Sequence, residues 1–102
     1  MEPFDLWLDP DVRVLVERHG QPLERYAVML QVLRDGEWRT IRLFDNAHGG
    51  HDMHRYDRYE KQDAERFFEG QPREALPAAI MHLKEHWQAI VESWEHEEET
   101  AE

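Results

Sequence analysis

The sequence predicts one α+β domain, in which a small antiparallel sheet of three to four strands, arranged as a meander, is covered on one face by a long C-terminal amphipathic helix. Three observations predict this fold class. Asp35-Gly36 separates two apolar runs, as in a tight two-residue hairpin. Around Val14, apolar and polar residues alternate as in a half-buried strand. Near the C-terminus, apolar residues recur every three or four positions, which is the spacing of one helix face.

The chain of 102 residues is long enough for one such domain and too short for two. Within the single domain, 1–102, we expect four segments. They are an N-terminal segment at 1–10, a sheet with a histidine-rich loop at 11–68, the helix at 73–96 and an acidic tail at 97–102.

The hairpin turn predicts a register for the strands at 25–34 and 37–45. A two-residue turn pairs Arg34 with Glu37, then Leu33 with Trp38, Leu30 with Ile41 and Val28 with Leu43. Side chains alternate between the two faces of a sheet, so the residues divide into two sets. The expected core face carries Tyr26, Val28, Leu30, Val32, Ile41 and Leu43. The opposite face is mixed, and we expect the N-terminal segment or a partner to cover it; it carries Ala27, Met29, Gln31, Leu33, Trp38, Thr40, Arg42 and Phe44.

The remaining elements have weaker patterns. Residues 12–17 read as a short first strand, and 51–58 as a third strand after the hairpin. Residues 62–68 are ambiguous between strand and helix. We place Pro77 in the first turn of the helix, where a missing N–H has no cost, and we expect fraying near Glu97 because acidic residues oppose the helix dipole there. The helix stripe consists of Leu76, Ile80, Leu83, Trp87, Ile90 and Trp94.

Composition and charge exclude several classes of function. The chain lacks cysteine, so disulfide frameworks and thiolate chemistry are excluded. No run approaches the roughly 18 apolar residues of a membrane span, and the acidic N-terminus does not resemble a signal peptide, so we expect a soluble, cytoplasmic protein without a membrane partner. The net charge of −11 divides into −3, −1 and −7 over residues 1–33, 34–68 and 69–102. Phosphate contact depends on Lys and Arg, so only the middle segment suits nucleic acid.

The middle segment also holds the densest cluster of reactive side chains, at 42–56. A neutral imidazole accepts a proton and a charged one donates it, so His48 with His51 or His54 could act as base and acid, with Asp45 orienting a ring. Arg42 and Arg55 could hold a phosphate, and Tyr56 lies beside them in sequence. These groups suffice for metal-independent cleavage of RNA, in which the 2′-hydroxyl is the nucleophile, and no cofactor is needed.

Two other interpretations of this segment remain open. Asp, Asn, Gly and His are common in surface turns, so the cluster could be turn chemistry alone. Alternatively, the spacing His48-x-x-His51-x-x-His54 offers three imidazoles, the number found in some catalytic zinc sites. A second pair, His82 and His86, flanks the apolar stripe of the helix, where we expect it to cover the sheet edge rather than bind a ligand.

Residues 24–95 resemble the TumE-like group of small bacterial toxins. The resemblance rests on Arg42-x-x-Asp45-Asn46-Ala47-His48, on the downstream His51-x-x-His54 with Tyr56, and on a helix with Leu83-Lys84-x-x-Trp87. It implies a toxin that acts on RNA, with a presumed site at Arg42, Asp45, His48, His51 and His54, and an antitoxin partner that often carries a helix-turn-helix.

The sequence therefore leaves two functional hypotheses. The first is an RNA-cleaving toxin that uses the histidine-rich loop and is bound by an antitoxin or another protein partner. The alternative is a non-catalytic acidic module, such as an antitoxin, inhibitor or nucleic-acid mimic, which binds through its Glu-rich helix. A homodimer is a further expectation for the mixed sheet face.

Overall fold

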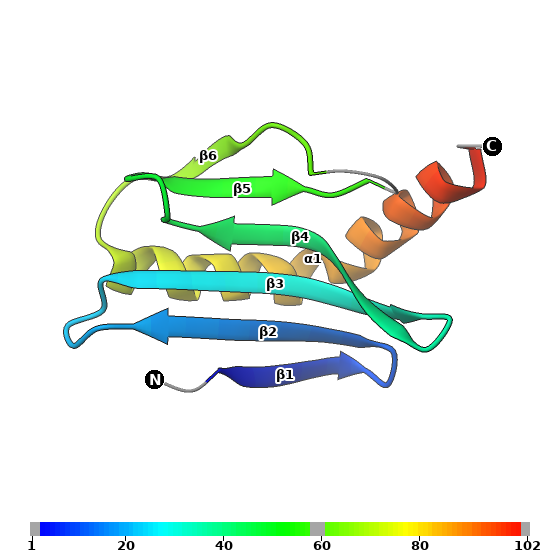
Figure 1. Cartoon of the computed structure of the whole chain (residues 1–102), viewed down its shortest axis with the longest axis horizontal. Coiled ribbons are helices and arrows are strands. Elements are labelled where there is room, and N and C mark those ends of the chain that lie inside the picture. The colour runs from blue at the N-terminus through cyan, green and yellow to red at the C-terminus, as the bar shows by residue number, and fades with distance from the viewer. Residues whose placement is uncertain (1–2, 58–60, 101–102) are drawn as a thin grey trace.

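The computed structural model of the chain describes residues 3–57 and 61–100, and the side chains of residues 98–100 lie outside that description. The described part forms a sheet followed by a single helix (Figure 1). The elements are β1 (Phe4–Asp9), β2 (Val12–His19), β3 (Arg25–Arg34), β4 (Glu37–Asp45), β5 (His51–Arg55), β6 (Glu65–Phe68) and α1 (Pro72–Thr100).

The sheet is a six-stranded antiparallel meander in the order β1-β2-β3-β4-β5-β6, and α1 lies along one face, mainly against β3 and β4 (Figure 1). The predicted α+β class is confirmed, but three to four strands was too few. One added strand, β1, comes from the segment expected to fold over the sheet. Its residues alternate in burial, with Phe4, Leu6 and Leu8 half-buried and the residues between them exposed, so it pairs with β2 as an edge strand. The other, β6, is the ambiguous segment before the helix.

A β-bulge in the central hairpin changes the predicted register. Arg34 pairs with Glu37 and Leu33 with Trp38, as expected from the turn. Beyond the pairing of Gln31 with Thr40 the register shifts by one residue, so that Leu30 lies opposite Arg42. The predicted pairs Leu30–Ile41 and Val28–Leu43 are therefore wrong, because a bulge places two residues of one strand opposite one of the other.

The bulge decides which side chains face the helix. Ile41 and Phe44 are three residues apart, so a strand with strict alternation could not bury both on one face. With the bulge between them, both are 2% exposed and Leu43 stays half-exposed on the other face. Arg42 also moves to the helix side, since it lies opposite the buried Leu30. This shift places Arg42 in the site described below.

The hydrophobic core lies between the sheet and α1. The predicted core face and helix stripe are largely confirmed, except that Leu43 faces away from the helix and that Ile80 and Trp87 are half-buried. The buried apolar residues are Val12, Val14, Val16, Tyr26, Val28, Leu30, Val32, Ile41, Phe44, Met53, Ala75, Leu76, Ala79, Leu83, Ile90, Val91 and Trp94.

The helix begins earlier and ends later than the predicted range of 73–96. Pro72 is its first residue, and the backbone N–H of Gln71 donates to the Glu74 carboxylate at 3.1 Å, which is half of a capping box. Pro77 therefore lies inside the helix and not in its first turn. Helical geometry continues to Thr100, so the fraying expected near Glu97 is not seen. Part of the expected third strand, at 58, and the end of the acidic tail, at 101–102, lie outside the described residues.

The second face of the sheet is not covered by the helix. Trp7 of β1 reaches Trp38 of β4 in an edge-to-face contact with ring centroids 5.5 Å apart. The Arg13 guanidinium lies 4.1 Å from the Trp38 ring centroid and donates to Gln31. We call this second face of the sheet, which α1 does not cover, the open face.

No helix among the described residues is both long and apolar enough to cross a membrane.

Candidate functional site

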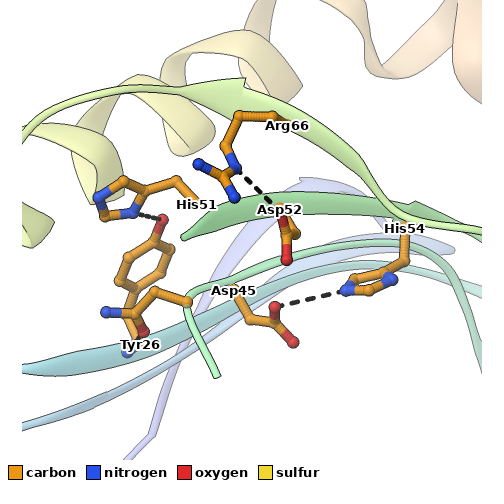
Figure 2. A network of polar contacts seen from close by, with 7 residues as sticks. Tyr26, Asp45, His51, Asp52, His54 and Arg66 are labelled. Carbon is orange, nitrogen blue, oxygen red and sulfur yellow. Dashed lines mark hydrogen bonds and ion pairs between the residues drawn. The ribbon is translucent and has the colours of Figure 1, made fainter. Parts of the chain in front are cut away.

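The sheet divides the histidine-rich segment between its two faces. Within β5, residues an odd number of positions apart point to opposite faces. His51 therefore points to the helix side, and His54, three residues later, points to the open face opposite Leu43 (Figure 2). His48 lies in the exposed turn between β4 and β5. The three histidine rings thus do not converge, and the alternative interpretation, a three-imidazole metal site, is not supported.

His51 connects the sheet to the segment just before the helix. It is 7% exposed, and both ring nitrogens have partners: Nε2 lies 2.8 Å from the Gly70 carbonyl oxygen and Nδ1 lies 2.8 Å from the Tyr26 hydroxyl. A carbonyl only accepts, so Nε2–H donates to Gly70, and in the neutral ring Nδ1 accepts from the hydroxyl. Burial, with the charges of Asp45 and Asp52, raises the pKa of Tyr26 above its ordinary value, which keeps this hydroxyl protonated. His51 is therefore a structural residue.

On the open face, three polar side chains from β4 and β5 come together (Figure 2). Asp45 lies directly opposite Asp52, and His54 follows on the same face of β5. The Asp45 carboxylate is 3.4 Å from Nε2 of His54, and the Asp52 carboxylate accepts from Arg66 of β6 at 3.2 Å. One ligating atom from each of Asp45, Asp52 and His54 lies within 4.8 Å of the others. We call these three residues the Asp–His cluster.

On the helix side, Arg42 and Arg55 are directly opposite each other on β4 and β5. Both line a cleft of about 360 Å³ between these strands and the last turns of α1. Nε of Arg42 is buried and has no hydrogen-bond partner among the described residues. Burial and then the charge of Arg55 lower the pKa of Arg42 from its ordinary value. The remaining lining residues are Ile41, Tyr56, Asp57, Gln62, Ile90, Ser93, Trp94 and Glu97.

The predicted substrate-binding residues are thus brought together, although the predicted acid and base are not. Tyr56 lines the cleft with Arg42 and Arg55, and its backbone N–H donates to the Ile41 carbonyl at 3.2 Å. Burial and the charge of Asp45 raise the pKa of Tyr56.

Sequence reasoning missed the helix residues of the cleft. Ile90, Ser93 and Glu97 recur at spacings of three and four along α1, which places them on one face, but only the apolar stripe was read from this pattern. His82 was expected to cover the sheet, and its ring packs edge-on against Phe44 with centroids 5.7 Å apart. Burial, then His86 and Arg42, lower the pKa of His82.

The fold and the site define a class: an α+β domain in which a six-stranded antiparallel meander and one helix enclose a cleft that carries two arginines. Within that class the chain belongs to the family described as Domain of unknown function (DUF7718), whose model matches residues 2–100. Neither a curated protein nor a solved structure matches the chain. The family match carries no link to the TumE-like group.

Proposed function

We propose that the protein binds RNA and holds a backbone phosphate between Arg42 and Arg55, in keeping with the toxin role that the resemblance implied. The observation that carries this proposal is the placement of two arginines directly opposite each other in one cleft. Like charges at opposed positions of a sheet repel, so the pair favours an anion between the two guanidinium groups. Arg binds phosphate through paired, charge-assisted N–H groups, which Lys cannot do.

The cleft supports this proposal through its size and its other lining groups. A volume of about 360 Å³ lies within the range of roughly 300–1,000 Å³ typical of small-ligand sites. Gln62 and Ser93 add neutral hydrogen-bonding groups to the lining. The surrounding acids Asp57 and Glu97 disfavour a long polyanion, so we expect a short single-stranded segment and not a duplex.

The proposed activity is binding, and not metal-independent cleavage by the three loop histidines. An acid and a base must both reach one phosphate, and His51 and His54 lie on opposite faces of the sheet. A toxin could act by sequestering RNA in the cytoplasm, and an antitoxin could oppose it by closing the cleft. The sequestration of RNA and its inhibition by an antitoxin are both part of the proposal.

Arg42→Gln and Arg55→Gln should each weaken RNA binding by about tenfold, since one charge-assisted contact to phosphate contributes on the order of 1.5 kcal/mol. The measurement is fluorescence anisotropy with a short labelled single-stranded RNA at fixed salt. Arg73→Gln is the matched control, because Arg73 is an exposed arginine in the first turn of α1, far along the helix from the cleft.

The salt dependence provides a second readout of the same contact. Losing one phosphate contact should reduce the slope of log K against log salt by about 0.7 for a single strand, while Arg73→Gln should leave it unchanged. Wild-type protein that does not bind RNA, or an Arg42→Gln variant that binds like wild type, would contradict the proposal.

A second candidate, the acidic interaction module, is favoured by one observation. The outer side of α1 presents exposed acids, including Glu85 and Glu92, within the segment that carries −7. Under this hypothesis the wild-type protein would bind a basic protein in a salt-sensitive manner and would leave RNA unbound. The anisotropy experiment above separates the two candidates, because only the first requires the cleft arginines.

A further inference from the structure

We propose that the Asp–His cluster on the open face, formed by Asp45, Asp52 and His54, is a binding site for one divalent transition-metal ion. The cluster supplies two carboxylates and one imidazole, and one ligating atom of each lies within 4.8 Å of the others. Such a mixed oxygen and nitrogen set suits Mn²⁺, Fe²⁺ or Zn²⁺ better than Mg²⁺ or Ca²⁺, which prefer oxygen alone. The proposal is independent of RNA binding, since the cleft lies on the other face of β4 and β5.

The buried imidazole indicates a missing ligand. His54 is 4% exposed, and its Nε2 is directed at the two carboxylates (Figure 2). Its contact with Asp45 is 3.4 Å, longer than the roughly 2.7–3.2 Å of a normal N–H···O bond, and Nδ1 has no partner among the described residues. A buried ring with only one long contact is poorly satisfied. A metal bound at about 2.0–2.1 Å would give Nε2 the close partner that it lacks, although it would leave Nδ1 unpaired.

The two carboxylates indicate a missing positive charge. Asp45 and Asp52 occupy directly opposed positions on neighbouring strands, an arrangement that destabilises like charges. Arg66 forms an ion pair with Asp52, and its side chain is 57% exposed, so it does little for Asp45, which is 9% exposed. A buried carboxylate requires a charged or hydrogen-bonding partner. A divalent ion between the two acids and His54 would compensate both charges at once.

The backbone already holds the three ligands in place. Asp45 and Asp52 are cross-strand partners, and His54 is two residues beyond Asp52, so all three point to the same face. They lie on strands and not on a mobile loop, so only small side-chain movements are needed to bring them to metal distances. The Asp52 side chain, 15% exposed, marks the side from which an ion and its remaining water ligands would enter.

The test is metal titration of the full-length protein after treatment with a chelator. Isothermal titration calorimetry with MnCl₂ and ZnCl₂ should show one site per chain, and Tm should rise with metal because binding stabilises only the folded state. MgCl₂ at the same concentration should produce a much smaller shift. His54→Gln and Asp52→Asn should each weaken binding by more than about 100-fold, beyond the 10- to 100-fold typical of residues that merely support a ligand.

Two control variants and a second measurement make the outcome decisive. His48→Gln, an exposed histidine of the same segment, and Arg42→Gln should both bind metal like wild type. Loss of binding in His48→Gln, or the absence of any binding by the wild type, would overturn the proposal. Should His54→Gln fail to fold, NMR of the wild type decides. Mn²⁺ must then broaden the resonances of Asp45, Asp52 and His54 first, and broadening centred elsewhere would overturn the assignment.

Discussion

At the scale of single residues, three histidines close in sequence have different environments. His51 forms hydrogen bonds with Tyr26 and Gly70, His54 faces two carboxylates, and His48 is exposed in a turn. The sequence predicted that Asp45 would orient one of the rings, and in the structure its carboxylate lies 3.4 Å from Nε2 of His54. The expected strand at 51–58 already implied that rings three residues apart point to opposite faces. The acid–base hypothesis did not apply that alternation to His51 and His54, and the structure shows that it holds.

The pKa of His82 predicts a pH dependence of stability. Burial, His86 and Arg42 lower this pKa below its usual 6.5, with Glu85 opposing them. The unfolded chain therefore binds a proton at a pH at which the folded chain does not, so stability falls as the pH drops from about 7 through 6.5 and below. His82→Gln should flatten this decline in Tm, whereas His48→Gln should leave it unchanged. An equally steep decline in His82→Gln would contradict the assignment.

At the scale of elements, the bulge in β4 explains most of the difference between expectation and structure. The turn at Asp35-Gly36 correctly predicted the first pairs of the hairpin, since local backbone requirements determine them. The shift at Ile41 is a tertiary effect: it arises because Ile41 and Phe44 both gain from contact with α1. Local turn chemistry carries no information on that contact. The side of the sheet on which Arg42 lies could therefore not be predicted from the turn alone.

Because of the bulge, truncating two neighbouring apolar residues should lower the free energy of unfolding by very different amounts. Phe44→Ala should lower the free energy of unfolding by about 3–5 kcal/mol, because Phe44 is buried against Phe67 and His82. Leu43→Ala should cost less than about 1.5 kcal/mol, because Leu43 is only half-buried on the open face. Urea denaturation of both variants measures the difference. The register expected from strict alternation requires the reverse order of costs.

At the scale of the whole molecule, one helix covers only part of a broad sheet. Contacts of α1 are concentrated on β3 and β4 (Figure 1). The open face carries Trp7, which is 59% exposed, beside Trp38. The fold class and the helix were predictable because each follows from a strong periodicity. The number of strands was not, since β1 and β6 are short edge strands whose pairing depends on their neighbours.

Exposed aromatic side chains on an open sheet face predict self-association or a protein partner. If a second copy covers the open face, wild-type protein should sediment as a dimer at micromolar concentration, and Trp7→Ser should sediment as a monomer. Met81→Ser is the matched control, because Met81 is a similarly exposed apolar residue on the helix. A wild-type chain that remains monomeric at all concentrations would direct the search to a different protein partner.

The odd spacing of His51 and His54 has a consequence for how related chains are recognised. The strand places the two rings on opposite faces of the sheet, so this short motif contains one ring bonded to Gly70 and one ring that faces two carboxylates. A related chain could lose the proposed metal site and still retain His51, because the hydrogen bond from His51 to Gly70 would not be affected. Shared histidines alone would then indicate common ancestry. The presence of His54 together with both Asp45 and Asp52 would indicate that a related chain has the same proposed metal site.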